Sequence, residues 1–341
     1  MQNNCDIILL SWNNTELLKK CVESLFKYTD VPCHLIIVDN ASNPETQTYL
    51  KTLKSTPWVR ITVDFNPVNE GFSKGMNRGM KQSQAPYVCL LNNDTEVSPH
   101  WLSRILNILD SNPQIGVLNP NSNIFGSPNT SQEIPFLEMG LCIGFCMFIR
   151  REVIQKIGYL DSETYDRFFF EDSDYCKRAK KAGYLCALAL NSYVHHAEHQ
   201  SVNRLGTKEE IFRKNQLIFY QKWGKPKRIL LPLMKNTKDI DWKELEQKLL
   251  PLARQDHAIQ IFTSDKAIPL KTHHTQLSVK FISPAFLFPW IILLRLLTKR
   301  KKPFDFIFVP QPELNHFLRK THLLYHAQLI TTWEELQKHV T

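Results

Sequence analysis

The sequence predicts an α/β protein, in which a mostly parallel sheet flanked by helices is followed by a smaller α/β domain. Short apolar, β-prone runs alternate with helical patterns up to about residue 200, and this alternation is typical of parallel strands joined by crossover helices. The chain of 341 residues also exceeds one domain of typical size. Its 43% hydrophobic and 22% charged residues are ordinary for a globular protein.

The elements of the first domain follow from periodicity. Strands are expected at 6–12, 34–38, 59–65, 87–91, 116–118, 144–150 and 184–190. Helices are expected at 16–26, 44–54, 75–82, 99–109, 151–157, 172–181 and 204–223. Thr15 is the expected N-cap of the first helix, whose apolar residues share one face. The turn-rich stretch 119–135 is expected to be a loop.

The domain boundary is expected after the helix that ends at residue 223. We expect a first domain at 1–223, a linker at 224–240 and a small α/β domain at 241–341, with strands at 258–262, 278–282 and 305–309. The apolar stretch 281–298 is at the short end of the roughly 20 residues that span a membrane, and two prolines interrupt it. A helix inside a βαβ unit is therefore favoured.

Charge and cysteine usage narrow the cellular setting. Residues 1–200 carry a net charge of −3 and residues 201–341 carry +12, which suits anionic lipid, an anionic acceptor or simply a solvated surface. Nucleic-acid binding is disfavoured, because the aromatic–basic interleaving of a known module is missing. The eight cysteines form no C-x-x-C pair and no secretory signal opens the chain, so we expect a cytoplasmic protein, with contact at the inner membrane face as an option.

Polar side chains follow the predicted strands at their carboxyl ends, where ligands collect in open α/β sheets. Asn92, Asn93 and Asp94 follow the strand at 87–91. A divalent cation carrying a nucleotide diphosphate needs one or two carboxylates, so Asp94 is predicted to hold such a cation. The structural alternative is that Asp94 only caps the helix after Pro99.

Three further clusters accompany Asp94. Asp39, Asn40 and Ser42 lie at the end of the second strand and Trp12 and Asn13 at the end of the first, where they can hydrogen-bond a base or ribose. The stretch 69–79 contains glycines that allow close approach of a ligand, with Lys74 and Arg78 as candidate phosphate contacts. Phe168–Phe170 precede Glu171, Asp172 and Asp174. Aromatic surroundings raise the basicity of a carboxylate, which suits a general base, whereas the helix dipole offers a structural explanation.

Taken in order, these clusters resemble inverting family-2 glycosyltransferases of the GT-A fold, especially bacterial rhamnosyl- and N-acetylhexosaminyl-transferases. The resemblance spans about Asp6–Ser201. It rests on the Trp-Asn loop, Val38–Ser42, Asn69–Phe72, Leu90–Asp94, Glu171–Asp174 and the late histidine before Ser201. The segment 302–309 looks like the opening half of a Rossmann-like GT-B domain, although a plain accessory domain explains it equally well.

The resemblance implies roles for individual residues. Asp172 would be the catalytic base, and Asp94 would bind Mg²⁺ or Mn²⁺ together with His196 or His195, of which the spacing to Ser201 favours His196. Asn92 stands where many relatives have Asp, which implies weaker metal binding. Phe170 and Glu171 would face the acceptor. The implied donor contacts are Trp12, Asn13, Asp39, Asn40, Ser42, Asn69, Gly71, Phe72, Lys74, Asn77, Asn92 and Asn93.

The implied function is transfer of a hexosyl, deoxyhexosyl or N-acetylhexosaminyl group from a nucleotide-diphosphate donor to a glycan or lipid-linked acceptor. The reaction would be a metal-assisted single displacement in bacterial surface polysaccharide biosynthesis. One alternative is a non-catalytic sugar-nucleotide-binding scaffold, which donor hydrolysis would distinguish. A nucleotidyltransferase would need an N-terminal Gly-rich phosphate loop with a basic residue, and residues 11–14 do not provide one.

Overall fold

The computed structural model describes residues 4–125, 134–165, 167–197, 208–234, 241–265, 273–298 and 302–340. The chain forms two compact units, Met1–Gly224 and Lys225–Thr341. Each unit has its own sheet and its own hydrophobic core.

The first unit is built on a mixed sheet. Its strands are β1 (Cys5–Ser11), β2 (Cys33–Asn40), β3 (Val59–Asn66), β4 (Tyr87–Asn92), β5 (Thr95–Val97), β6 (Ile115–Asn121), β7 (Phe136–Met139), β8 (Cys146–Arg150) and β9 (Leu185–His196). Its helices are α1 (Thr15–Tyr28), α2 (Pro44–Thr52), α3 (Phe72–Gln82), α4 (Trp101–Ser111), α5 (Arg151–Ile157), α6 (Glu171–Lys181) and α7 (Lys208–Trp223), with the 3-10 turn η1 at Asn123–Phe125.

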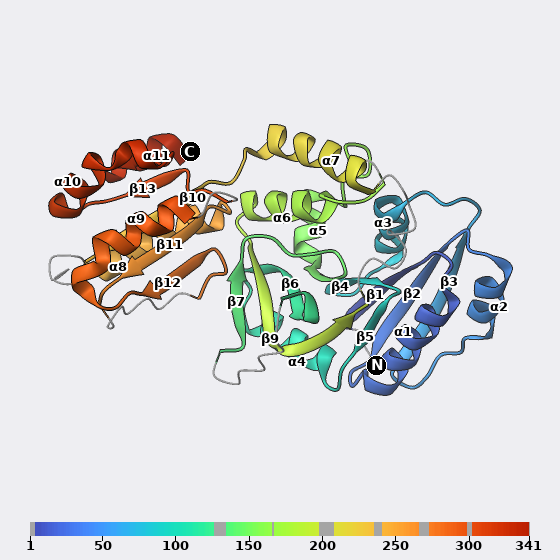
Figure 1. Ribbon diagram of the computed structural model, residues 1–341. Helices are drawn as coiled ribbons and strands as arrows, with labels where there is room; N and C mark the ends of the chain where they lie inside the picture. Colours follow the sequence, from blue (N-terminus) through green and yellow to red (C-terminus); the bar gives the residue numbers. More distant parts are fainter. Residues whose placement is uncertain are drawn as a thin grey trace. The chain divides into compact units, whose positions relative to one another are not determined.

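The strand order is β3-β2-β1-β4-β8-β6-β9-β5, and β7 pairs with β9. Strands β1 to β4 are mutually parallel, whereas β8 runs antiparallel to β4 and β6. Alternate residues of the parallel strands enter two different cores, because successive side chains of a strand point to opposite faces. One core contains α1 and α4, and the other contains α3, α5 and α6, so that helices cover both faces of the sheet (Figure 1). The predicted α/β class is confirmed.

Most elements lie within a few residues of their predicted positions, and the differences have local causes. Thr15 is the first residue of α1 rather than its cap: Asn14 is the N-cap in a left-handed conformation, and the Thr15 hydroxyl lies 2.8 Å from that of Thr46. The predicted loop 119–135 contains the end of β6, because Asn119 and Asn121 continue its pairing with β9. Residues 126–133 of that loop lie outside the described residues.

The second unit contains a parallel sheet of its own. Its strands are β10 (Arg228–Leu233), β11 (Ala258–Thr263), β12 (Leu277–Phe281), β13 (Phe306–Phe308) and β14 (Gln328–Ile330). Its helices are α8 (Trp242–Arg254), α9 (Phe288–Thr298), α10 (Pro312–Lys320) and α11 (Trp333–Val340), with 3-10 turns η3 (Ala285–Leu287) and η4 (His322–Leu324). The order β12-β11-β10-β13-β14, with every pair parallel, is a doubly wound arrangement.

Strand β10 corrects the predicted linker at 224–240. Residues 228–233 form the central strand of the second sheet and pair with both β11 and β13. The apolar run of β10 is short and contains Pro232, a residue that argues against a central strand in sequence-based reasoning. Helices α8 and α11 pack on one face of this sheet and α9 and α10 on the other. Among the described helices, none has the length and apolarity needed to span a membrane.

A buried carboxylate ties α7 to α6 in the first unit. Asp174 has no exposed surface and forms ion pairs of 2.8 Å with Arg178 and with Lys222 at the end of α7. It also accepts hydrogen bonds from Trp223 Nε1 at 2.8 Å and from the Tyr165 hydroxyl at 3.2 Å. Asp174 is therefore occupied by structural contacts.

We expect Asp174→Asn to lower the free energy of unfolding by about 2–3 kcal/mol, less than for a fully buried pair because Arg178 and Lys222 retain contact with water. Chemical denaturation of the full chain measures the change. The matched control is Glu209→Gln, because Glu209 forms the same i,i+4 pair with Arg213 on an exposed helix face and should leave the unfolding midpoint unchanged. Equal midpoints for the two variants would contradict the anchoring role.

Candidate active site

The parallel strands bring the predicted polar clusters to one edge of the first sheet. Ser11 at the end of β1 lies in register with Asp39 of β2, and Leu10 lies in register with Asn92 of β4. Asn40 is in register with Asn66 of β3. The carboxyl ends of four neighbouring strands therefore form a continuous polar edge, which is where open α/β sheets bind ligands.

Two buried oxygens on this edge lack partners within the described parts of the chain. Asp39 accepts hydrogen bonds at Oδ2 from the Ser42 amide (3.2 Å) and from Gln47 Nε2 (3.3 Å), but its Oδ1 has no hydrogen-bond partner. The Ser11 hydroxyl is likewise unsatisfied. Because buried polar atoms are normally hydrogen-bonded, Asp39 Oδ1 and Ser11 Oγ indicate a place for ligand donors such as a base N–H or a ribose hydroxyl.

The loops after β1 and β2 hold each other in place. The Asn13 amide donates to Ser42 Oγ, and the Asn43 amide donates to Asn13 Oδ1, both at 2.8 Å. Asn13 and Asn14 have φ of 56° and 53°, a region that asparagine tolerates better than most residues. The predicted donor residues Trp12, Asn13 and Ser42 therefore lie together beside Asp39.

Asn40 and Asn69 shape the edge through protein contacts. Asn40 Nδ2 donates to Asn69 Oδ1 and to the Gly71 carbonyl, and Asn40 Oδ1 accepts from Asn66 and from the Glu70 amide. Gly71 has φ 83° and ψ −178°, a combination that is essentially restricted to glycine. The side-chain amide of Asn40, predicted to contact the donor, thus holds the 66–71 loop.

Helix α3 is also more structural than predicted. Cβ atoms at Gly75 and Gly79 would lie 2.4 Å from Leu10 and 2.3 Å from Ile8, so these glycines allow helix–sheet packing rather than ligand approach. The Asn77 side chain exchanges two hydrogen bonds with the backbone of Leu160. Asn77 therefore holds this loop, in contrast to its predicted contact with the nucleotide-sugar donor. Of the two basic residues predicted to contact phosphate, Arg78 binds Asp64 with two hydrogen bonds. Lys74 lies 3.3 Å from the exposed Glu163, and its phosphate contact stays a prediction.

The pairing of β5 with β9 brings a histidine to Asp94. Thr95 is in register with His196, and the Asp94 carbonyl accepts from the Ala197 amide. His196 Nε2 lies 3.2 Å from Asp94 Oδ1, and both side chains are buried. His195 is exposed because neighbouring residues of a strand face opposite ways. His196 is thus the histidine that lies beside Asp94, whereas His195 faces away from it.

Asp94 and His196 suit a divalent cation. Although only 3.2 Å apart, Asp94 Oδ1 and His196 Nε2 form no hydrogen bond with each other or with another described residue. The amide nitrogen of the neighbouring Asn93 is unsatisfied too. A carboxylate oxygen and an imidazole nitrogen that converge in this way are an appropriate pair of ligands for a divalent first-row metal ion. The backbone of Asn92, in contrast, is fully used: its carbonyl accepts a hydrogen bond from the Thr95 hydroxyl, and its amide donates to the Phe145 carbonyl.

Gly144 and Phe145 connect the separate clusters, and sequence reasoning missed them. The Gly144 amide donates to Asp172 Oδ2 at 2.8 Å, and the Phe145 ring stacks on the His196 ring at 5.1 Å. Asn119 holds this dipeptide by bonding the backbone of Ile143 and Cys146. The only local signal was a glycine immediately before an apolar strand.

Two adjacent carboxylates begin α6. Asp172 is partly exposed, and burial is the main cause that raises its pKa to about 6, with the nearby Cys176 adding to the shift; hydrogen bonds from the amides of Gly144 and Ser173 oppose it. Glu171 is buried, and burial followed by the charge of Asp172 raises its pKa well above the ordinary value. Its Oε2 has no hydrogen-bond partner among the described residues. Asp172 is therefore the more accessible of the two carboxylates, and the acceptor-side role of the buried Glu171 stays a prediction.

Helix α7 supports the turn that leads into these carboxylates. Phe169 and Phe170 have φ of 76° and 74°, and such strained conformations persist only where the surroundings hold them. Asn215 of α7 is buried and donates through Nδ2 to the carbonyls of Phe168 and Phe169. Phe170 packs against Phe212 and Phe219 of α7. The predicted acceptor wall at Phe170 is thus a packing contact inside the unit.

Three cysteines form the one other cluster of metal-ligand types within the described residues. The ligand atoms of Cys142, Cys176 and Cys186 lie within 4.8 Å of one another and are buried. Burial raises the pKa of Cys142 and Cys176 well above the ordinary value, and Cys142 Sγ donates to two backbone carbonyls. The thiols of Cys142 and Cys176 are therefore core groups that resist ionisation, which does not favour thiolate ligation of a metal.

Comparison with known proteins gives a consistent result. Residues 6–158 match the family model described as Glycosyl transferase family 2. A glycosyltransferase of Haemophilus influenzae is 27% identical over 178 residues, which cover 47% of this chain and 59% of the relative. Over the three curated relatives from Sinorhizobium fredii, Nostoc and H. influenzae, the chain covers 27%, 53% and 59% of their length.

Two solved structures share the fold of this chain. The mannosyltransferase PcManGT of Pyrobaculum calidifontis, solved with GDP-Man and Mn2+, has a TM-score of 0.50 at 14% identity and covers 59% of each chain. S. aureus TarS 1-349, solved with UDP-GlcNAc, has a TM-score of 0.50 at 15% identity, covering 75% of this chain and 72% of that one. At these identities the likeness concerns the fold.

Proposed function

This chain belongs to glycosyl transferase family 2, and from that premise we propose that it is an inverting glycosyltransferase using a nucleotide-diphosphate sugar and a divalent cation. The acceptor would be a glycan or a lipid-linked glycan of bacterial surface polysaccharide biosynthesis. A poly-beta-1,6-N-acetyl-D-glucosamine synthase of Staphylococcus epidermidis is 21% identical over 174 residues, which cover 46% of this chain and 42% of the relative. The basic second half of the chain suits work at an anionic membrane.

One observation carries this proposal: Asp94 Oδ1 and His196 Nε2 converge without hydrogen-bond partners among the described residues. The Phe145 ring stacks on the His196 ring, and the amide of the preceding residue, Gly144, donates to Asp172. A cation site and a carboxylate base thus share one short connecting segment. The structure solved with GDP-Man and Mn2+ supports the choice of cation and donor class. Mg²⁺ prefers oxygen ligands, so it would rely on Asp94 and the diphosphate oxygens.

The proposed reaction is one displacement at the anomeric carbon. Ionised Asp172 accepts the proton of an acceptor hydroxyl, the hydroxyl oxygen forms a bond to the anomeric carbon, and the bond to the diphosphate oxygen breaks on the opposite side. A bound divalent cation would offset the charge that develops on the departing diphosphate. The Gly144 amide holds the Asp172 carboxylate, and Asp39 Oδ1 would accept from the base or ribose. Because no covalent intermediate forms, the configuration inverts.

Nucleotide binding tests the proposal first. The full chain is titrated with UDP, GDP and dTDP, each with and without Mn²⁺, and the matching sugar donor is then assayed for slow hydrolysis. We expect tight binding of one nucleotide only with the cation, followed by release of the diphosphate. Binding without hydrolysis or transfer would favour a non-catalytic scaffold, and no binding by any nucleotide would overturn the donor site.

We expect Asn215→Asp to lower kcat of the full chain roughly tenfold to hundredfold, with little change in nucleotide affinity. A carboxylate at this position cannot donate to the carbonyls of Phe168 and Phe169, so the strained turn that positions Asp172 relaxes, and small displacements of catalytic groups are expensive. The measurement is kcat beside the nucleotide Kd. Gln221→Glu, the same amide-to-carboxylate exchange at an exposed site of α7, is the control. An unchanged kcat in folded Asn215→Asp would refute this positioning role.

A further inference from the structure

The second unit exposes an unusual row of large apolar side chains. Trp290 and Leu294 of α9 are 61% and 59% exposed, and Leu323 of η4 is 87% exposed. We name as the apolar face the side chains of Phe286, Leu287, Trp290, Leu294, Leu323 and Leu324, all of them exposed. Single exposed apolar residues are normal, but a contiguous group on one surface marks an interaction site.

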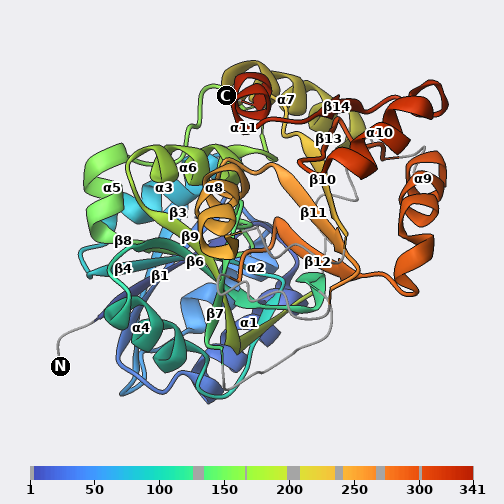
Figure 2. The same ribbon diagram turned by 90° about the vertical axis from the view of Figure 1, so that its left-hand side faces the viewer.

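The members of this face come from neighbouring elements. Leu287, Trp290 and Leu294 are spaced by three and four residues, which places them on one side of a helix. The Trp290 ring contacts Phe317 of α10 with centroids 5.0 Å apart, so that α10 and the η4 turn after it lie beside α9 (Figure 2).

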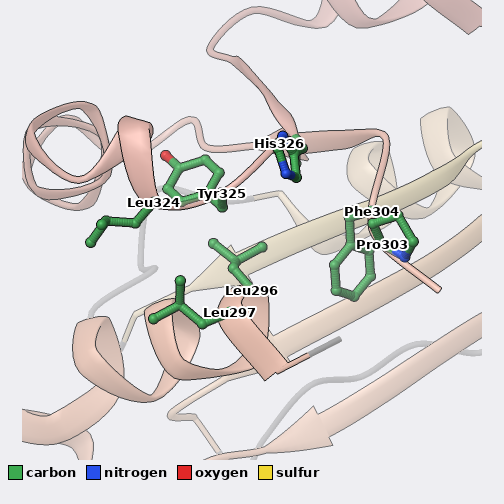
Figure 3. A pocket seen from close by; sticks show the side chains of 8 residues that line it. Leu296, Leu297, Pro303, Phe304, Leu324, Tyr325 and His326 are labelled. Carbon is green, nitrogen blue, oxygen red and sulfur yellow. The ribbon is translucent and has the colours of Figure 1, made fainter. Parts of the chain in front are cut away.

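A recess joins α9 to η4 at this place. It has a volume of about 350 Å³ and is lined by Leu296 and Leu297 of α9, Pro303 and Phe304, and the segment 324–327 (Figure 3). Its lining combines apolar side chains with polar groups such as the Tyr325 hydroxyl and His326. The recess gives an acyl chain a surface to pack against next to the exposed leucines.

Folding of the unit does not require the apolar face. Phe288 and Ile292 of α9 pack into the sheet core, and Leu293 is buried as well. The exposed side chains lie on the other side of the same helix. α9 is therefore apolar all round, and a helix of that kind is expected to be covered on its outer side as well.

The charge next to the apolar face is positive. Residues 281–304 contain five Lys or Arg residues and no Asp or Glu. Arg295 of α9 and Lys302 after it are exposed, as are Arg319 and Lys320 at the end of α10. Apolar and aromatic side chains bordered by Lys and Arg complement a bilayer surface that bears anionic headgroups.

We propose that the apolar face docks on the surface of a bilayer containing anionic phospholipid. Trp290, Leu294 and Leu323 enter the acyl boundary, and Arg295 and Lys302 contact headgroup phosphates. The purpose of this contact rests on the proposed function, because a lipid-linked acceptor would lie in that surface, but the binding itself needs no catalysis. With 11 residues, α9 is too short to cross the bilayer and lies in the interface.

A second copy of the chain fits the apolar face less well. A twofold contact through it would bring Arg295 and Lys302 of both copies together, and the segment 281–304 offers no carboxylate to pair with them. Like charges facing each other across an interface oppose association. The surface of an anionic bilayer would instead attract these positive side chains.

The test is co-sedimentation of the full chain with vesicles of phosphatidylcholine alone and of phosphatidylcholine with phosphatidylglycerol in equal parts. We expect binding to the anionic vesicles only, weakened by salt, and quenching of tryptophan fluorescence by bromine-labelled acyl chains that Trp290→Phe reduces. The double variant Leu294→Glu with Leu323→Glu should bind at least about tenfold more weakly, because two inserted side chains become charged. Leu217→Glu, at a site of α7 that is 64% exposed, should bind like the wild type.

Each outcome decides the question. Loss of vesicle binding in the double variant, with nucleotide binding retained, supports the proposal. Equal binding by wild type and double variant overturns it. A wild type that ignores vesicles but forms a dimer dissociated by the double variant would assign the face to a second copy. A wild type that stays monomeric and does not bind vesicles would also overturn membrane docking. Nucleotide titration is independent of these results, so a failure of membrane docking is distinguishable from a failure of the proposed transferase activity.

Discussion

Replacing Asp172 by asparagine should lower the rate of sugar transfer by roughly 10³-fold, the contribution typical of a positioned general base. Asparagine has the shape of aspartate, and its one oxygen can still accept the 2.8 Å hydrogen bond from the Gly144 amide. It loses the second oxygen, which accepts from the Ser173 amide, and it cannot take up a proton. Nucleotide affinity should stay close to that of the wild type. Transfer assays beside nucleotide titration measure both quantities on the same preparation.

Glu171 provides the discriminating variant. Burial, together with the charge of Asp172, raises the pKa of Glu171 well above its ordinary value, which favours the protonated form of this carboxyl. Glu171→Gln replaces this buried carboxyl by an amide of the same shape, and its effect on transfer should be far smaller than that of Asp172→Asn. The opposite ranking of the two variants would assign the base to Glu171.

The pH dependence of the same reaction follows from the pKa of Asp172, which is about 6. The base must be ionised, so the rate should rise with pH through about 6 and level off above it. Stability has the opposite sign: the folded-state pKa lies above the ordinary value of 3.8, the folded protein binds more protons in that window, and stability falls as pH rises from 3.8 to about 6. Above that window, Asp172→Asn should therefore be no less stable than the wild type. A lower unfolding midpoint there would contradict the burial of this charge.

Removing the carboxylate of Asp94 should abolish the metal-dependent part of nucleotide binding. For Asp94→Ala we expect nucleotide affinity in the presence of Mn²⁺ to fall by at least about hundredfold, since even residues that only hydrogen-bond to metal ligands contribute tenfold to hundredfold to metal affinity. Sugar transfer should fall by a comparable or larger factor, because the departing diphosphate loses its counter-charge. Nucleotide titration with and without Mn²⁺ measures the first effect.

A thermal-shift experiment checks the same site without catalysis. Mn²⁺ should raise the unfolding temperature of the wild type, because a ligand that binds only the folded state stabilises it, and it should not do so for Asp94→Ala. The matched pair is His196→Ala and His195→Ala: the buried His196 lies 3.2 Å from Asp94, whereas His195 is exposed on the other face of β9. Equal Mn²⁺ responses of these two variants would refute the ligand assignment.

The sequence alone determined the features that depend on neighbouring residues. Apolar runs that end abruptly in polar residues located β1, β2 and β4 together with Asp39 and Asp94, because a buried strand and the polar turn after it are a local pattern. The α/β class followed from the alternation of such runs with helices, and the order of the clusters carried the resemblance to family-2 glycosyltransferases. These inferences needed no contact between distant segments.

The tertiary structure decided which polar side chains are available for chemistry. The side-chain amides of Asn40 and Asn77 donate to groups of other loops, and the partner of Asn77 lies 83 positions away in the chain. His196 was separated from His195 only by the pairing of β9 with β5. Gly144, just before the apolar strand β8, belongs to the site because its amide donates to Asp172, 28 positions further along the chain. Local sequence reports the chemistry that a side chain offers, whereas the partners that use or free it are set by long-range packing.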